Sequence, residues 1–567
     1  MEKRLNRWLL VFLVFAGFLL RVYKISSYPP LIWDEASLGY NAYSILKTGR
    51  DEYGKFLPLI FKSFGDYKPG LYVYLTVPFV AIFGLNEFAV RLPAVIFGSL
   101  TPVFFYLLIK ELFAKKKPAF LSALALAFLP WHIHFSRGAW ESNLLTFFLV
   151  LAAYFFTRTF KRKNANFNFL LLFLIAVLLS LWVYQGAKML TPLIVFGLLF
   201  FNKRYWTSYF KAKKSRPGLI LGLAIAAVFF LIGSWYWQSF SGKSSNRLKV
   251  MSLFSYARPV EEISRVLSES GTEEKNLHFY LFHGEWLRFF RGFLLRYFNY
   301  FSARFLSFEG DWTNPRHSAP YFGVIGHVNF ILFILGLTFF LARERKRPRY
   351  FLVYWLLCAP LPAALSRDII TGVRSLSMAV PISFFIGYGL SGILELKAIE
   401  LIRKAIFFAL ILFALFDFVY YWDLYYHHMV IRSPKEWLYG HKEVINFVRE
   451  NQSENQKVLM TNFYGQPYIY YLFYSKYLPL NYQKQASLKE SVFGDVGQVE
   501  RVDNIFFNSL SWQADSVKKD SLVIFSEDEI LRSGVENDQS VMKELRPLGR
   551  IGGLSTFYGF GPVEGNE

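Results

Sequence analysis

Two neighbouring carboxylates, Asp34 and Glu35, follow the first apolar stretch of the chain. Carboxylates held just above a membrane surface can accept a proton from a hydroxyl or hold a cation. The local residues also fit a plainer interpretation, in which a solvated acidic pair begins an interfacial helix near Ala36. These residues alone favour the plainer interpretation, so the wider pattern has to decide whether the pair does chemistry.

A third acid lies in the short polar turn 131–143, where Glu141 follows Arg137 by four residues. This spacing predicts that the two side chains share one face of a helix. His132 and His134 occupy the same turn, but histidines two residues apart do not share a helix face, and the usual zinc-ligand spacings are absent. We interpret both histidines as packing residues at the membrane interface.

Three basic residues, Lys188, Arg367 and Arg374, fall in short turns that are predicted to face outward. Outer turns of membrane proteins are usually poor in Lys and Arg. A clamp for a phosphate group explains them through charge-assisted hydrogen bonds. Snorkelling toward lipid headgroups explains them equally well. The polar run 308–317, also predicted outside, has no assigned role.

The composition limits the kinds of protein that could carry these residues. Of 567 residues, 54% are hydrophobic, 20% are aromatic and only 18% are charged, whereas a soluble domain carries about 25% charged residues. The apolar content, the 37 Gly and 23 Pro, and the single cysteine exclude disordered, collagen-like and disulfide-rich classes. The net charge of +22 does not indicate a nucleic-acid partner, because cytoplasmic loops of membrane proteins collect Lys and Arg. A membrane protein with many spans remains.

Apolar stretches that approach the length of a spanning helix, about 20 residues, recur along the chain. They predict an all-α polytopic membrane protein with about eleven transmembrane helices. The apolar stretch 71–84 is short and interrupted by proline, so we expect it to lie in the interface. The predicted spans are 8–23, 91–110, 118–134, 143–160, 167–184, 188–202, 218–237, 322–342, 350–366, 375–394 and 405–422.

Basic clusters predict the orientation of these spans. The candidate cytoplasmic loops are all rich in Lys and Arg, which places the N-terminus in the cytoplasm of a multi-pass protein of the cell membrane. We expect the first span to be an uncleaved anchor, because no small-residue cleavage site follows it. We therefore predict a membrane domain at 1–422 with outer loops at 24–90 and 238–321. The tail 423–567 alternates strand and helix patterns, which predicts a small extracytoplasmic α/β domain.

An ordered set of residues in the first outer loop resembles a known family. It matches the lipid-phosphate-sugar glycosyltransferases of the C superfold, such as the family 39-like protein O-mannosyltransferases and the aminoarabinose lipid A transferases. The likeness covers roughly residues 5–145 by motif and the remainder by architecture. The matching residues are Asp34-Glu35, Tyr40, Gly49, Lys68-Pro69 and Arg91-Leu92-Pro93.

This resemblance implies a single, inverting displacement that moves a sugar from a polyprenyl-phosphate donor to an acceptor on the outer face. Asp34 takes the place of the base, and Glu35 and Glu141 would orient the acceptor or tune that base. Glu141 departs from the family, which more often has Asp there. The implied donor-phosphate contacts are Lys68, Lys188, Arg367 and Arg374, and the supporting residues are Arg91, Arg137 and Tyr40.

The expected partners are the lipid-linked donor, membrane lipids, and an acceptor that is a lipid, a glycan or a protein. No cofactor or metal is implied by residue spacing, although an Asp-Glu pair is able to bind a divalent cation. Two other functions stay open. A transporter or flippase of lipid-linked glycans would normally show internal repeats and ionisable residues deep in its spans. A polymerase or ligase of lipid-linked glycans would share the spans but not the ordered first-loop motifs.

Overall fold

The computed structural model divides the chain into two compact units, each described here by itself. Unit 1 comprises residues 1–17, 98–135 and 142–421, and unit 2 comprises 18–97, 136–141 and 422–567. The first outer loop and the tail therefore share one unit. The domain boundary predicted at residue 422 separates a membrane part of the chain from an extracytoplasmic part, and it stays a prediction. The residues that the structure describes are 2–161, 167–212, 252–255, 258–396, 399–453, 456–489, 496–518 and 520–561.

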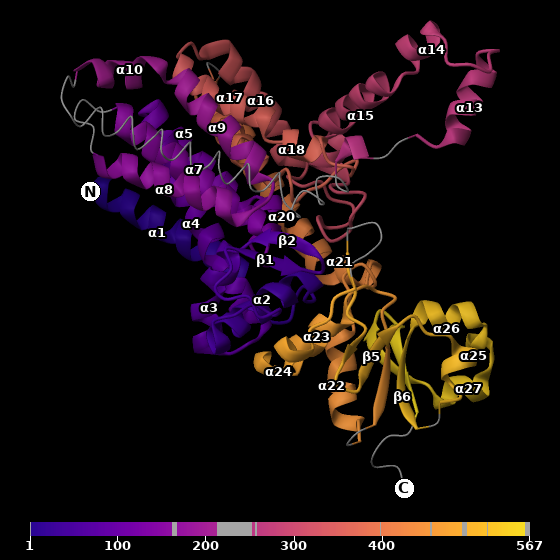
Figure 1. Cartoon of the computed structure of the whole chain (residues 1–567). Helices are drawn as coiled ribbons and strands as arrows, with labels where there is room; N and C mark the ends of the chain where they lie inside the picture. The colour runs from indigo at the N-terminus through magenta and orange to yellow at the C-terminus, as the bar shows by residue number, and fades with distance from the viewer. Residues whose placement is uncertain are drawn as a thin grey trace. The chain divides into compact units, whose positions relative to one another are not determined.

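Unit 1 is built from α-helices (Figure 1). Its core places α19 against both α5 and α16. Glycines allow this approach, because a Cβ on Gly336 would lie 1.7 Å from the carbonyl oxygen of Phe385. Four helices, α1 (Glu2–Val22), α4 (Glu87–Phe113), α7 (Glu141–Lys161) and α20 (Glu400–Asp423), have residues in both units. The other described helices of unit 1 are α5 (Lys116–Phe128), α6 (Pro130–Phe135), α8 (Phe167–Val183), α9 (Ala187–Phe201), α10 (Lys203–Ala212), α13 (Val260–Glu269), α14 (Leu277–Phe282), α15 (Glu285–Asn299), α16 (His327–Arg343), α17 (Phe351–Cys358), α18 (Leu361–Ala364) and α19 (Ala379–Leu394).

Helices able to cross a membrane are present, which supports the predicted membrane location. Within the described residues four helices are long and apolar enough: Glu87–Phe113, Glu141–Phe160, Leu376–Leu394 and Glu400–Arg432. The predicted number of eleven spans is not confirmed.

Two predicted spans differ from the observed helices because each is interrupted near a proline. The predicted span 118–134 is interrupted where α5 ends at Phe128 and α6 begins at Pro130. The predicted span 350–366 is divided into α17 and α18 around Pro360. Proline has no N–H to donate and clashes with the preceding turn, so it interrupts a helix that hydropathy reads as continuous. The predicted span 218–237 lies outside the described residues.

The first loop of unit 2 contains a helix, a hairpin and a second helix. They are α2 (Trp33–Thr48), β1 (Ile60–Ser63), β2 (Asp66–Pro69) and α3 (Leu71–Phe83). The hairpin was not predicted, and its turn uses Gly65 at a φ of 90°, a conformation that costs little only for glycine. Gly39 lets α2 pack closely, because a Cβ there would lie 2.5 Å from Val90 Cγ2.

The tail in unit 2 forms a six-stranded mixed sheet in the order β4-β5-β3-β6-β8-β7. The central strand β3 runs parallel to β5 and β6, and the remaining pairs are antiparallel. Strand patterns in the sequence at 457–463 and 521–525 correspond to β3 and β6, whereas the pattern at 502–507 is divided between the antiparallel strands β4 and β5. The final β7–β8 hairpin was not predicted. The strands are β3 (Lys457–Thr461), β4 (Arg501–Val502), β5 (Ile505–Asn508), β6 (Ser521–Ser526), β7 (Arg546–Ile551) and β8 (Leu554–Phe560).

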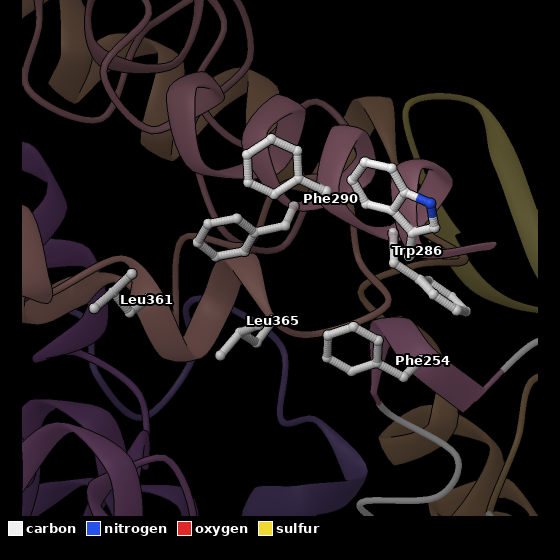
Figure 2. A pocket seen from close by; sticks show the side chains of 7 residues that line it. Phe254, Trp286, Phe290, Leu361 and Leu365 are labelled. Atoms are coloured by element: carbon white, nitrogen blue, oxygen red, sulfur yellow. The ribbon is translucent and has the colours of Figure 1, made fainter. Parts of the chain in front are cut away.

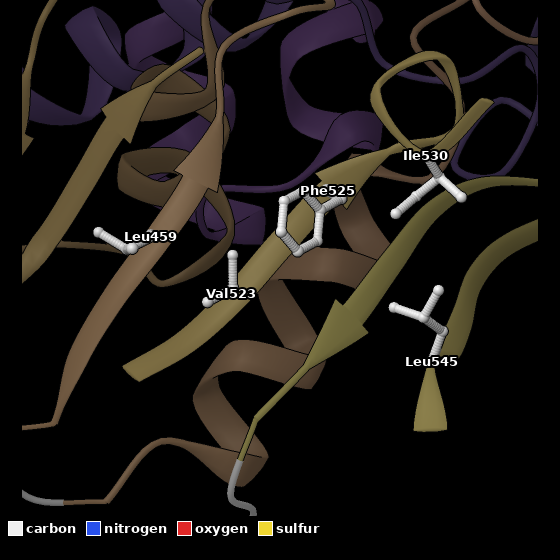
Figure 3. Close-up of a cluster of buried hydrophobic side chains, with 5 residues drawn as sticks. All are labelled: Leu459, Val523, Phe525, Ile530 and Leu545. Atoms are coloured by element: carbon white, nitrogen blue, oxygen red, sulfur yellow. The ribbon is translucent and has the colours of Figure 1, made fainter. Parts of the chain in front are cut away.

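Helices cover this sheet and complete its core. Figure 3 shows Leu459 and Val523 with Phe525, Ile530 and Leu545, all buried together. Burying such side chains stabilises a domain by about 1.5–3 kcal/mol each. The tail helices are α21 (Met429–Arg432), α22 (His441–Asn451), α23 (Pro467–Tyr474), α24 (Pro479–Gln485), α25 (Trp512–Asp515), α26 (Glu527–Ser533) and α27 (Gln539–Glu544).

Candidate functional site

Asp34 and Lys68 form an ion pair on the first loop. Asp34 is the second residue of α2, and Lys68 is on β2, which the hairpin register places opposite Phe61. Lys68 Nζ contacts Asp34 Oδ1, and Trp33 Nε1 donates to Asp34 Oδ2 at 3.0 Å. The Asp34 side chain is 38% exposed and that of Lys68 is 13% exposed. A molecule from solution can therefore reach the carboxylate.

Lys68 keeps its positive charge in this setting. Burial alone lowers the pKa of a lysine, but the carboxylates of Asp34 and Glu141 outweigh burial and hold the pKa of Lys68 above its usual value. Glu141 begins α7 and is half-buried. The structure thus brings three of the predicted residues, the two acids and the lysine, into one electrostatic cluster.

Glu35, the neighbour of Asp34, is buried and fully engaged. Arg91 Nε donates to Glu35 Oε1 at 2.8 Å, and Arg91 Nη2 donates to Oε2 at 2.6 Å. Two backbone N–H groups, of Ile32 and Ala139, donate to the same carboxylate at 3.2 and 2.8 Å. Since its oxygens are occupied, Glu35 holds the start of α2 in place rather than contacting an acceptor.

Arg91 donates through all five of its N–H groups. Besides the two bonds to Glu35, it donates to three backbone carbonyls in the segment that precedes α2. Those carbonyls belong to Ile25, Pro29 and Pro30, at 2.8, 2.9 and 3.1 Å. The guanidinium therefore fixes the entrance to the loop that carries Asp34.

Arg137 plays a similar part at the end of α1. Its guanidinium donates to the Tyr425 hydroxyl at 3.2 Å and lies over the rings of Tyr425 and Tyr426. The interpretation that Arg137 shares a helix face with Glu141 is wrong, because α6 ends at Phe135 and α7 begins at Glu141. The backbone carbonyls that accept from Arg137 are those of Leu20, Arg21 and Tyr28.

Tyr40 lies six residues beyond Asp34 on α2 and is fully buried. Its hydroxyl donates to the Tyr477 carbonyl at 3.2 Å, and its ring meets Tyr482 edge to face. The structure places Tyr40 between α2 and the tail helices, where it packs and does not line an opening.

The other predicted phosphate contacts lie in unit 1. Arg374 Nη1 pairs with Asp368 and donates to Ser366 Oγ at 3.1 Å. Arg367 Nε is 4.0 Å from Asp368 Oδ1 and its side chain is 42% exposed. Lys188 is the second residue of α9, half-buried. Arg367 and Arg374 are thus gathered around one aspartate.

Residues of the polar run 308–317, which had no assigned role, line a cavity with this arginine turn. The cavity has a volume of about 490 Å³, and its lining includes Thr313, His317, Arg367 and Asp368. Polar and apolar side chains both line it.

Asp311 connects the polar run 308–317 with the turn that contains Gly372. Sequence reasoning did not single it out. It is buried, accepts from His317 Nδ1 at 2.7 Å and accepts from the Gly372 N–H at 2.9 Å. Burial would raise the pKa of Asp311, but His317 and these hydrogen bonds hold it below its usual value. No pattern in the sequence marks this aspartate, because its partner at Gly372 is 61 residues away.

An apolar groove adjoins the same turn. Figure 2 shows Phe254, Trp286 and Phe290 on one side and Leu361 and Leu365 on the other, and the groove has a volume of about 680 Å³. Leu365 directly precedes the polar turn. Unit 1 therefore carries an apolar groove and, next to it along the chain, a cavity of mixed lining that includes Arg367.

Comparison with known proteins identifies this architecture. Residues 67–237 match the family model described as Dolichyl-phosphate-mannose-protein mannosyltransferase. The structure matches ArnT from Cupriavidus metallidurans in the apo state with a TM-score of 0.53, at 12% identity, over 99% of this chain and 100% of that one. The chain has the fold of ArnT. ArnT bound to undecaprenyl phosphate matches with a TM-score of 0.52 at 12% identity, over 97% and 99% of the chains. No curated protein matches the sequence.

These matches confirm the predicted resemblance to these families. The family model begins at residue 67 and so includes Lys68, Arg91 and Glu141, but not Asp34. At 12% identity the structural match shows the fold alone. Within the described residues, this glycosyltransferase fold holds no group of three His, Cys, Asp or Glu side chains placed to bind a metal.

Proposed function

We propose that this chain is an integral-membrane glycosyltransferase that takes a sugar from a polyprenyl-phosphate donor and transfers it to an acceptor hydroxyl at the outer face. The observation that carries the proposal is the reachable Asp34 carboxylate beside a lysine that stays cationic. A base and a positive charge are the two things that displacement of a sugar phosphate needs.

Asp34 and Lys68 divide the chemistry between them. Asp34 accepts the proton of the acceptor hydroxyl as its oxygen bonds to the anomeric carbon, and the bond from that carbon to the phosphate oxygen breaks. The polyprenyl phosphate leaves with the electron pair, so configuration inverts. Lys68 stabilises the departing phosphate. Lys68 contacts Asp34, and movement of the Lys68 ammonium to the phosphate would free that carboxylate to act as a base.

Features of unit 1 support a lipid-linked donor. The groove of Figure 2 is lined by aromatic and leucine side chains and suits an isoprenoid chain. Arg367 and Arg374 beside it suit a phosphate. ArnT, which shares the fold, has been crystallised with undecaprenyl phosphate.

Lys68→Ala is expected to weaken undecaprenyl phosphate binding by about tenfold or more, because a hydrogen bond between charged groups contributes about 1.5–3 kcal/mol. Binding would be measured with the full chain in lipid nanodiscs. Lys62→Ala is the matched control, since Lys62 lies on the same hairpin but contacts the Tyr53 ring. Equal affinity in the parent and Lys68→Ala would remove Lys68 from the phosphate site.

Arg367→Ala and Arg374→Ala are expected to differ in their effect on thermal stability. The exposed Arg367 contributes little to folding, because such pairs are worth about 0–1 kcal/mol, so its loss should weaken binding alone. Removing Arg374 leaves the carboxylate of Asp368 without its closest cation, so thermal stability should fall as well. If neither change alters lipid binding, the two arginines serve the turn and not the donor.

The experiment that tests the function is transfer of label from radioactive polyprenyl-phosphate sugars by the purified chain in lipid. A lipid extract and a peptide pool would be offered as acceptors. Transfer to either class supports the proposal and names the acceptor class. Folded protein that binds no donor and transfers nothing overturns it, and label that crosses the bilayer without transfer would identify a transporter.

A further inference from the structure

Glu52 is a fully buried acid in the loop between α2 and the hairpin, with an exposed fraction of 0%. Asn41 Nδ2 donates to Glu52 Oε1 at 3.1 Å, and the Glu52 N–H donates to Asn41 Oδ1 at 3.1 Å. Among the described residues nothing hydrogen-bonds to Glu52 Oε2. A buried carboxylate with one bare oxygen is costly, whereas a neutral carboxylic acid is not.

Glu52 lies among other titratable groups. It forms no ion pair within the described part of the chain, and the acid that acts on it is Asp51 in the same loop. Four tyrosines and two lysines face it from the neighbouring elements. These are Tyr40 of α2, Tyr53 of the same loop, Tyr468 of α23, Tyr482 of α24, and Lys62 and Lys68 of the hairpin.

Burial raises the pKa of Glu52 to about 8, with Asp51 adding to the rise and Asn41 and the two lysines opposing it. Glu52 is therefore mostly protonated at neutral pH. This agrees with the geometry, since a protonated acid needs no counter-ion for its second oxygen.

The charge of Glu52 matters because it acts on Lys68. Three carboxyl groups act on that one ammonium: Asp34, Glu141 and Glu52. Were all three ionised, the cluster would be strongly negative and would repel a phosphate. A neutral Glu52 removes one of those negative charges without removing a side chain from the packing.

We propose that Glu52 is a positioning residue that stays uncharged while the donor binds, so that Lys68 is left available to the donor phosphate. It acts through Lys68 and through its hydrogen bonds with Asn41, which lies on the same helix as Asp34. The inference rests on the proposed function, because it concerns the same phosphate.

The direction of the pH effect follows from the sign of the charge. Below its pKa Glu52 is neutral and adds no negative charge beside Lys68. Glu141 also acts on Lys68 and titrates at lower pH, because burial raises its pKa to about 7. As the pH rises through about 8, Glu52 becomes negative beside Lys68 and phosphate binding weakens. Lys68 keeps its charge over this range, because its own pKa is raised. The phosphate is already doubly ionised above about pH 7, so its titration does not produce the loss.

The test measures the affinity of undecaprenyl phosphate for the full chain in nanodiscs between about pH 6.5 and about pH 9.5, a range that spans the titration. The parent is expected to lose about tenfold in affinity, the equivalent of one pKa unit of charge interaction. Glu52→Gln, which keeps the acceptor for Asn41 and cannot ionise, is expected to lose the fall in affinity near pH 8. It keeps only the smaller change near pH 7, where Glu141 beside Lys68 titrates. Asp51→Asn removes the neighbouring negative charge and should move the loss to lower pH.

The outcomes separate the inference from the function it rests on. Binding that is absent at every pH, in folded protein, overturns the proposed function. Binding that falls identically in the parent and Glu52→Gln overturns the role of Glu52. Infrared spectroscopy gives a readout without donor, because the parent should show a protonated carboxylic acid band at neutral pH that Glu52→Gln lacks. Absence of that difference also overturns the inference.

Discussion

Asp34→Asn is expected to lower the transfer rate about 10²–10⁴-fold, the contribution typical of a positioned general base. Asparagine has nearly the same shape and can still accept from Trp33 Nε1, as Asp34 does at 3.0 Å. It cannot accept a proton from the acceptor. Donor affinity should survive, because Lys68 loses its competing partner while keeping its charge. Rates are measured with saturating labelled donor, and affinity is measured with undecaprenyl phosphate.

The comparison that isolates Asp34 is with Asp66→Asn on the hairpin. Asp66 accepts from the Tyr67 N–H at 2.8 Å and is half-buried, so its loss tests the general effect of removing an acid from this loop. We expect transfer by Asp66→Asn to stay close to that of the parent. Transfer by Asp34→Asn at the parent rate would show that the acceptor is already ionised or that another group takes its proton.

Composition and hydropathy were enough to predict a helical membrane protein, and strand patterns predicted most of the tail sheet. These patterns are local, and they fail where contacts between distant segments determine the secondary structure. The hairpin that carries Lys68 is too short to show a strand pattern, and it is held by a tight turn at Gly65. Similarly, hydropathy does not register the break at Pro130, because the residues on both sides of it are apolar.

Some residues of the candidate site could be predicted from the sequence, and others could not. Asp34 and Lys68 could be singled out by resemblance, and the structure places them in contact. Glu35 looked equivalent to Asp34 because the two are adjacent, yet helix geometry turns adjacent side chains about 100° apart. One side chain remains reachable, and the other is buried against Arg91, 56 residues away. The burial of Glu52 and Asp311 has no signal in a single sequence either, because it arises from distant segments.

Arg91→Ala is expected to lower the free energy of unfolding of unit 2 by about 3–5 kcal/mol, the usual cost of breaking a buried ion pair by removing one partner. The change leaves Glu35 buried with a negative charge and only backbone donors. It also releases three carbonyls that precede α2. Hydrogen exchange of the α2 amides would report the loss, since exchange measures local opening.

Two further variants show whether the charge or the packing is responsible. Arg50→Ala is the control in the same loop, because Arg50 is exposed and its guanidinium donates to the Gly54 carbonyl at 2.8 Å. Its effect should stay within about 0.5 kcal/mol. Arg91→Leu combined with Glu35→Leu should recover part of the loss, since an apolar pair removes the uncompensated charge. If the double variant is no more stable than Arg91→Ala, the carbonyl contacts of the guanidinium outweigh its pairing with Glu35. Asp34 would then be positioned chiefly by the backbone that Arg91 gathers.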